Sequence, residues 1–145
     1  MGYTHSWSNA RALTDSEWDA ITTMARRVLR VAQDDLGIAL SLEYDVNRIP
    51  VVSETEIRFN GYGEEGHETF LITREPEEFA FCKTARKEYD PAVVAILHGC
   101  AVHASGFEWG SDGSHEDLED GLKLYNEACG AGWDYTNVKQ QEHRK

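Results

Sequence analysis

The sequence predicts an α+β fold, a single domain in which a largely antiparallel sheet is covered by about three helices. Helical patterns occupy residues 14–36, 90–106 and 114–129, and short strand-like runs lie between them. No repeated crossover helix separates these runs, as a parallel sheet would require. A chain of 145 residues has the usual size of one domain, so we expect one globular unit at 1–130 and a loosely structured tail at 131–145.

The first helix is predicted to begin after Thr14. Thr14 and Glu17 have capping-box spacing, so the hydroxyl and the carboxylate can satisfy free amides at the helix start. Apolar residues then recur at steps of three and four, which places them on one helical face, and Gly37 is suited to end the helix. The apolar face consists of Trp18, Ile21, Ala25, Val28, Leu29, Ala32 and Leu36.

Strand-like runs follow at residues 38–43, 56–60 and 68–73, and a short apolar run at 79–82 predicts a fourth strand. Three glycines between residues 60 and 66 allow the positive-φ backbone of a tight connection. The second and third runs are therefore expected to form a hairpin.

The second helix is predicted to begin at Asp90, with Asp90 as its cap and Pro91 in its first turn. The residues that follow are apolar on most sides up to Gly106, which indicates a buried central helix. A short strand at 107–109 and a turn then lead to the third helix, which Ser114 is suited to cap.

The charge of the chain restricts its ligands. With 26 acidic and 14 basic residues the formal net charge is −12, which opposes broad binding to a nucleic-acid backbone. The densest basic cluster outside the first helix is formed by Lys83, Arg86 and Lys87 in the run FCKTARKEYD. Such a cluster can hold one or two phosphates or a carboxylate, or can form ordinary surface ion pairs.

Three widely spaced cysteines, Cys82, Cys100 and Cys129, include no CxxC pair, so we expect buried reduced thiols. His98 and His103 would lie about 140° apart around a helix, which does not suit joint metal ligation. No metal or other cofactor is expected. Since no apolar run approaches about 18 residues and no signal peptide is evident, we expect no membrane association and a cytoplasmic location.

Four ordered motifs cover most of the chain: the start MGYTH, the run RFNGYGEEGHETF, the run FCKTARKEYD and a late SDG. Together they resemble a family of small, largely uncharacterised proteins of bacteriophages and bacteria. The chain departs from the family pattern at Ser6, Glu88 and Gly110. The resemblance implies a task in host takeover or counter-defence, and a location in the host cytoplasm if the protein is phage-encoded.

The motifs contain the candidate catalytic residues. Tyr3, Thr4 and His5 form a string of hydrogen-bonding side chains, and if they begin a strand, Tyr3 and His5 share one face. His67 and Glu68 are interpreted as opening the strand after the hairpin. Because a histidine can act as a general acid or base near neutral pH, the candidates are His5, His67 and Glu68, with structural roles as the alternative.

The candidate ligand-binding residues include the same motifs. Asn60 either caps a turn or contacts a base or ribose, and Tyr89 either stacks on a base or packs. Ser111 and Asp112 either close over a ligand or serve the turn, and Asp90 is interpreted as a cap rather than a catalyst. The full predicted set is Tyr3, Thr4, His5, Asn60, His67, Lys83, Thr84, Arg86, Tyr89, Ser111 and Asp112.

Three functions are compatible with these residues. The favoured one is binding of a small anionic, nucleotide-like ligand by sequestration or sensing, with Lys83, Arg86 and His67 facing phosphate. The second is an enzyme acting on such a ligand, in which His5 or His67 transfers protons and the basic residues stabilise charge. The third is an acidic interaction module or decoy that binds a host protein. The oligomeric state is left open.

Overall fold

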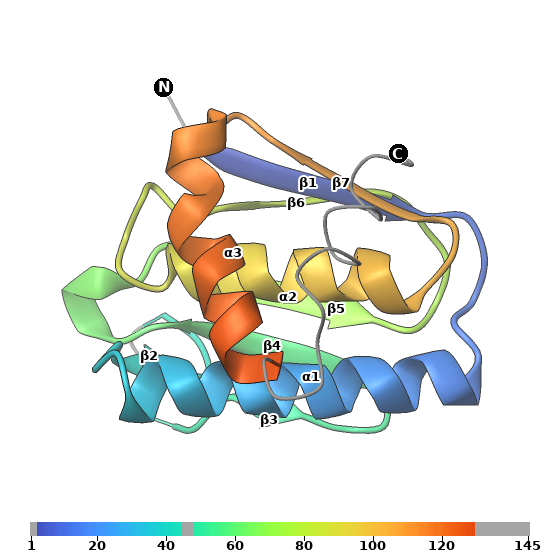
Figure 1. Ribbon diagram of the computed structural model, residues 1–145, viewed down its shortest axis with the longest axis horizontal. Coiled ribbons are helices and arrows are strands. Elements are labelled where there is room, and N and C mark those ends of the chain that lie inside the picture. The colour runs from blue at the N-terminus through green and yellow to red at the C-terminus, as the bar shows by residue number, and fades with distance from the viewer. Residues whose placement is uncertain (1–2, 45–47, 130–145) are drawn as a thin grey trace.

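The computed structural model describes residues 3–44 and 48–129, and the predicted tail at 131–145 lies outside the described residues. Three helices and two sheets with antiparallel pairings confirm the predicted α+β class (Figure 1). The elements are β1 (Thr4–Asn9), α1 (Asp15–Asp34), β2 (Leu40–Ser41), β3 (Val51–Val52), β4 (Glu56–Gly61), a 3₁₀ turn (Gly63–Glu65), β5 (Phe70–Thr73), β6 (Glu77–Lys83), α2 (Asp90–His103), β7 (Phe107–Ser111) and α3 (His115–Cys129).

The first sheet has the strand order β6-β1-β7, so the chain's first strand lies in its centre. His5 is in register with Cys82 of β6 on one side and with Ser111 of β7 on the other. The second sheet has the order β2-β4-β3, and β5 also pairs with β4. Antiparallel pairing in the first sheet therefore brings the start of β1 to the ends of β6 and β7.

Two strand predictions need correction, and one short strand was not predicted. The run at 38–43 contributes only the two residues of β2, and the two-residue strand β3 was not predicted because so short a pairing has no periodicity. His67 and Glu68 do not open a strand, since β5 begins at Phe70. The Asn60 side chain bonds the backbone of His67 and holds this segment in a loop.

The capping box predicted for the first helix is present. The Thr14 hydroxyl accepts from the amide of Glu17 at 3.1 Å, and the Glu17 carboxylate accepts from the amide of Thr14 at 3.0 Å. Arg11 also bonds Glu17 and is the main cause that lowers the pKa of this carboxyl to about 2. The predicted apolar face is buried except at Leu36, which is exposed because the helix already ends at Asp34.

The predicted central helix is α2, which packs on α1, on α3 and on β7 (Figure 1). Glycines allow the helices to approach closely. A Cβ atom at Gly99 would lie 2.5 Å from Met24 of α1, and one at Gly121 of α3 would lie 2.4 Å from Val94 of α2. The three cysteines are buried and free, as predicted. None of the helices in the described part of the chain has the length and apolar character needed to span a membrane.

Candidate functional site

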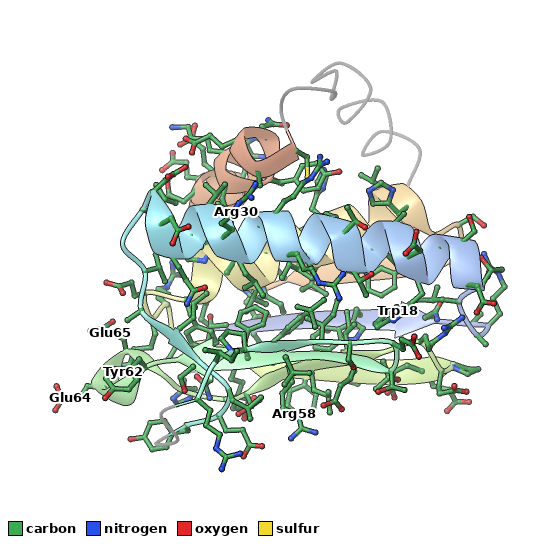
Figure 2. The ribbon with its side chains drawn as sticks, turned by 90° about the horizontal axis from the view of Figure 1, so that it is seen from below. Trp18, Arg30, Arg58, Tyr62, Glu64 and Glu65 are labelled. Carbon is green, nitrogen blue, oxygen red and sulfur yellow. The ribbon has the colours of Figure 1, made fainter. Side chains whose placement is uncertain are left out.

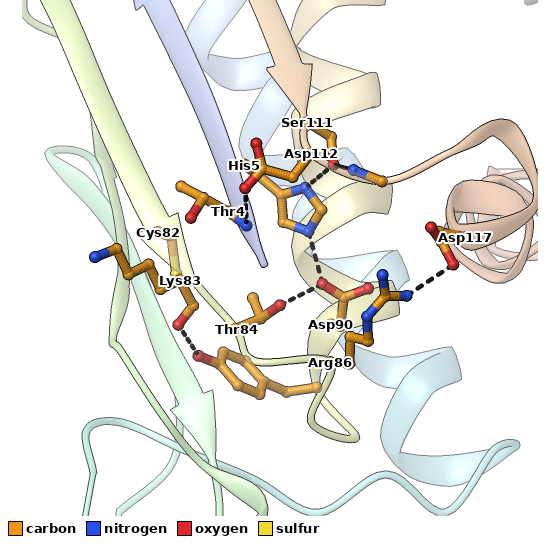
Figure 3. Close-up of polar contacts among 12 residues, drawn as sticks. Thr4, His5, Cys82, Lys83, Thr84, Arg86, Asp90, Ser111, Asp112 and Asp117 are labelled. Atoms are coloured by element: carbon orange, nitrogen blue, oxygen red, sulfur yellow. Dashed lines mark hydrogen bonds and ion pairs between the residues drawn. The ribbon is translucent and has the colours of Figure 1, made fainter. Parts of the chain in front are cut away.

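The end of the first sheet gathers motifs that are far apart in the sequence. The start of β1 is held between the end of β6, through the Thr84 amide and the Tyr3 carbonyl, and the end of β7, through the Asp112 amide and the Thr4 carbonyl. The helix α2 begins at the same place, seven residues after β6 ends. Four segments therefore meet around His5 (Figure 3).

His5 is wholly buried and bridges two side chains (Figure 3). Its Nδ1 lies 2.8 Å from Ser111 Oγ, and its Nε2 lies 2.6 Å from Asp90 Oδ1. The Thr84 hydroxyl donates to the same Asp90 oxygen at 2.5 Å. The arrangement joins a hydroxyl, an imidazole and a carboxylate in one hydrogen-bonded chain.

The donors in this chain follow from the chemistry of the groups. An ionised Asp90 can only accept, so Nε2–H of His5 donates to it, and Nδ1 is left to accept from the Ser111 hydroxyl. The amide of Gly113 donates to Ser111 Oγ at 2.9 Å, which orients the hydroxyl further. The order nucleophile, base and carboxylate is that of a Ser-His-Asp triad, with the two ring nitrogens exchanged.

Asp90 does not cap α2, which corrects its interpretation from the sequence. The residue before the helix is Tyr89, and it makes no side-chain cap. Asp90 is itself the first helical residue, so its carboxylate is free to turn toward His5 and Thr84. Because the Asp90 side chain is only 11% exposed, its carboxylate needs such partners, since burial of an unpaired charge is costly.

Tyr3 packs against His5. Their rings meet edge to face at 5.1 Å, and Arg86 Cζ lies 4.1 Å from the centre of the Tyr3 ring. Burial and the nearby Asp90 raise the pKa of Tyr3. The Arg86 guanidinium is bonded to Asp117 at 2.7 Å and holds the pKa of that carboxyl at about 2. Arg86 is therefore already paired with an anion of the protein itself.

The turn that presents Arg86 has an unusual backbone. Ala85 and Arg86 both have positive φ, 53° and 57°, although neither is glycine. The amide of Lys87 donates to the Thr84 carbonyl at 2.9 Å and closes the turn. Left-handed backbone costs roughly 1–2 kcal/mol per non-glycine residue, so the surrounding contacts must hold this turn in place.

The cavity beside Arg86 is predominantly acidic. It has a volume of about 380 Å³, and its acidic residues outnumber its basic ones. It is lined by Tyr3, Arg86, Lys87, Glu88, Asp90, Pro91, Glu116, Asp117 and Asp120. The acidic lining opposes the predicted attraction of an anion to this end of the sheet.

A second cavity, of about 310 Å³, is lined by residues of β7, α2 and α3 and includes Ser111. Trp109, Leu118 and Leu122 give it apolar walls, and His98, Gly110, Ser111 and His115 complete it. The helix α3 begins at His115, after a cap in which Ser114 and Asp117 bond each other. In its first turn the amide of Asp117 is satisfied by Ser114, whereas the amides of His115 and Glu116 have no acceptor within the helix.

Asn60 lies outside this cluster. Its wholly buried amide group bonds the loop between β4 and β5: Nδ2 donates to the His67 carbonyl, and Oδ1 accepts from the amides of Gly61 and His67. Of the two alternatives given for Asn60, this geometry fits the turn-stabilising one.

His67 is exposed and also lies apart from His5. It lines a third cavity, of about 710 Å³, which Tyr44, Glu64, Glu65, Gly66, Glu68 and Lys87 complete. Figure 2 shows Glu64 and Glu65 projecting from this end of the molecule. The two candidate histidines therefore belong to separate places, so His67 does not assist the His5 chain.

The remaining candidates divide between core and surface. Tyr89 is wholly buried, and its hydroxyl donates to the Glu68 carbonyl at 2.5 Å, so it packs and offers no face for stacking. Lys83 is exposed and extends away from His5, with Nζ 5.9 Å from the centre of the Phe81 ring (Figure 3). Asp112 accepts from the amide of Thr4 at 3.2 Å and ties β1 to the end of β7.

The sequence pointed to His5, Thr84 and Ser111 but not to their connection: His5 and Thr84 share Asp90 as a partner, and Ser111 joins them through His5. It also missed Asp117, which pairs with Arg86. Strand order is the information that would have predicted this cluster. Because β1 lies between two antiparallel neighbours, its start lies beside the ends of both β6 and β7.

No protein-family model matches the chain, and no curated protein or solved structure is significantly similar to it. The resemblance to the bacteriophage and bacterial family therefore stays a prediction.

Proposed function

We propose that the protein is a hydrolase that works through a covalent serine intermediate, with Ser111 as nucleophile, His5 as base and Asp90 as the carboxylate that orients the base. The observation that supports it is the unbroken chain from Ser111 Oγ through both ring nitrogens of His5 to Asp90 Oδ1, with distances of 2.8 and 2.6 Å. It refines the prediction of a histidine acid/base enzyme by supplying the nucleophile.

The proposed reaction has two steps. In the first, His5 Nδ1 takes the proton of Ser111 while Oγ attacks a carbonyl carbon, and the leaving group departs with that proton. In the second, a water gives its proton to His5 and attacks the acyl-serine, which releases the acid and restores the hydroxyl. Asp90 stays ionised and stabilises the imidazolium through Nε2–H.

The oxygen that becomes negative needs donors. The amide of Gly113 is already bonded to Ser111 Oγ, so we assign this role to the amides of His115 and Glu116 at the start of α3, which follow it in the chain. Backbone amides at a helix start are suited to a developing oxyanion, because they need no reorganisation during the reaction.

The apolar cavity beside Ser111 suits an uncharged acyl or aryl group. Its volume of about 310 Å³ and its walls of Trp109, Leu118 and Leu122 match a small apolar substrate part. The acidic residues around Arg86 disfavour a strongly anionic substrate. Carboxylic esters of neutral acids are therefore the proposed substrate class.

The direct test is labelling with an uncharged fluorophosphonate, followed by intact mass and peptide mapping. We expect one adduct, on Ser111, formed by the wild type and not by Ser111→Ala. Ser6→Ala is the matched control, because Ser6 lies on the adjacent strand and is also partly exposed, and it should be labelled like the wild type. A wild type that is folded yet never labelled would exclude the proposal.

Binding of a nucleotide-like anion is the second candidate. Arg86 favours it, because its guanidinium is 59% exposed at the edge of a cavity, where it can meet a phosphate. A thermal-shift series with mono- and cyclic nucleotides tests it. Stabilisation of the wild type that is absent in Arg86→Gln supports binding, and recovery of the nucleotide intact or cleaved distinguishes a binder from an enzyme.

A further inference from the structure

The hydroxyl group of Tyr3 is a buried polar group that the hydrogen-bonded chain of His5 does not use. Tyr3 is only 5% exposed, and its Oη makes no well-formed hydrogen bond with any residue in the described part of the chain. Burial of a hydroxyl without a partner is costly, so such a group calls for a specific reason. A partner that arrives with the substrate would supply that reason.

The register of the first sheet places Tyr3 beside the turn that follows Ser111. His5 lies opposite Ser111, and the same register continued by two residues places Tyr3 opposite Gly113. Tyr3 and His5 share one face of the strand, and their rings are in contact. A Cβ atom at Gly113 would lie 2.4 Å from Tyr3 Oη, so glycine leaves the space that the hydroxyl fills.

The Tyr3 hydroxyl also lies close to the proposed nucleophile. Burial raises the pKa of Tyr3, but a hydrogen-bonding contribution from Ser111 lowers it. The two hydroxyls are therefore close, even though their geometry falls short of a full hydrogen bond. The oxygen of an acyl group on Ser111 is separated from Oγ by only one carbon atom. A donor near Oγ is therefore also near the oxygen that becomes negative.

The Tyr3 hydroxyl is protonated at neutral pH. Burial and the nearby carboxylates of Asp90 and Asp117 raise its pKa above the usual value of 10.0. It can therefore donate a hydrogen bond, and it does not compete with His5 as a base. Because the group is fixed before the reaction and shielded from water, its hydrogen bond to a developing charge is stronger than it would be in water.

We propose that Tyr3 is a further catalytic residue, which donates a hydrogen bond from Oη to the carbonyl oxygen of the substrate as that oxygen becomes negative. The inference rests on the proposed hydrolase reaction, and it adds a side-chain donor to the amides of His115 and Glu116. The proton stays on Tyr3 throughout, so no covalent bond forms or breaks there. The proposal also accounts for Gly113, because a side chain at that position would displace the donor.

Removal of one oxygen atom tests this role. In Tyr3→Phe the rate of Ser111 labelling by the uncharged fluorophosphonate should fall about 10²-fold, the usual effect of losing one oxyanion donor. The urea midpoint of unfolding should stay the same or rise, because the variant no longer buries an unpaired hydroxyl. Tyr89→Phe is the matched control. Its lost hydroxyl donates to the Glu68 carbonyl, so the midpoint should fall while labelling stays within about twofold of the wild type.

Gly113→Ala tests the same hydroxyl from its neighbour. The new Cβ atom must displace Tyr3 Oη, but the amide that bonds Ser111 stays in place. The labelling rate should fall about tenfold or more when this is the only substitution. In the Tyr3→Phe background it should fall by no more than about twofold, because both substitutions remove the same interaction.

The outcomes distinguish this inference from the hydrolase proposal. If the wild type is labelled and Tyr3→Phe is labelled at the same rate, the role of Tyr3 alone is overturned. A large fall in the unfolding midpoint of Tyr3→Phe would also overturn it, because the hydroxyl would then have a structural partner. A folded wild type that is never labelled would overturn the hydrolase proposal and this inference with it.

Discussion

Asn60 and His5 are both wholly buried polar side chains beside a strand end, yet their surroundings differ. The main partners of Asn60 are backbone groups of Gly61 and His67, at most seven residues away. The partners of His5 are the side chains of Asp90 and Ser111, 85 and 106 residues away. A side chain that satisfies nearby backbone fixes a loop, whereas one that joins distant side chains brings reactive groups together.

The largest effect is expected from a substitution that breaks the hydrogen-bonded chain of His5 without removing side-chain volume. Asp90→Asn can no longer hold the imidazole in the tautomer that leaves Nδ1 basic, so the rate of Ser111 labelling should fall by about 10³- to 10⁴-fold. Time-resolved intact mass with the fluorophosphonate measures this rate. The unfolding midpoint shows whether the variant is still folded under the labelling conditions.

Thr84→Val is the matched control for that variant. It removes the hydroxyl that donates to the same Asp90 oxygen but leaves the pair with His5 in place. We expect a loss of labelling rate of about tenfold or less. Equal losses in the two variants would mean that the chain is only a structural tie, and the contrast with Asn60 would disappear.

Asn60 should show the opposite pattern. Asn60→Ala leaves the amides of Gly61 and His67 and the carbonyl of His67 without their partner, which should cost about 3 kcal/mol of unfolding free energy. Urea denaturation measures the loss. The rate of Ser111 labelling, determined where the variant is folded, should stay within about twofold of the wild type.

Gly66→Ala probes the same loop from the backbone side. A Cβ atom there would lie 2.6 Å from the Gly61 carbonyl oxygen and 2.9 Å from Asn60 Oδ1, so the loop must shift. A loss of about 2 kcal/mol is expected. If either loop variant reduced the labelling rate as strongly as Asp90→Asn, the two regions would be one site and the comparison would be wrong.

The elements with strong local signals could be predicted from the sequence, whereas the site could not. The capping box at Thr14 and the glycines of the hairpin are local patterns, and both elements are confirmed. Asp90 followed by Pro91 is also the local pattern of a helix cap, but here the prediction was wrong. The Asp90 carboxylate bonds His5 instead, and His5 lies 85 residues earlier in the sequence. Contacts over such distances depend on strand order, which periodicity does not encode.

The basic cluster illustrates the same limit. Lys83, Arg86 and Lys87 are close in the sequence and predicted a positive surface. In the fold, Arg86 turns to Asp117 of α3, and Lys83 extends along the outer face of the sheet. A short run of like charges thus says little about the field at a site, because charges from other elements can cancel it.

The strained turn between Thr84 and Arg86 gives a smaller effect. Ala85→Gly should stabilise the protein by up to about 1 kcal/mol, because glycine adopts positive φ without steric cost. The matched control is Ala20→Gly in α1, where the same exchange should destabilise by about 1 kcal/mol. Urea denaturation measures both variants. Destabilisation by both would show that the turn is not strained at Ala85.

The smallest effect is expected for the exposed ion pair of Arg86 and Asp117. Its response distinguishes a surface contact from the buried hydrogen-bonded chain of His5. Arg86 is the main cause that lowers the pKa of Asp117 to about 2, below its usual 3.8. The pair therefore stabilises the folded state above about pH 4, and this contribution is lost as the pH falls toward 2. The difference in unfolding free energy between the wild type and Arg86→Gln should therefore shrink over this range, and also in 1 M salt, because exposed pairs are screened. Ser111 labelling at neutral pH should be unchanged in Arg86→Gln. A large loss of labelling would place Arg86 in the reaction and extend the site from the buried chain to the surface.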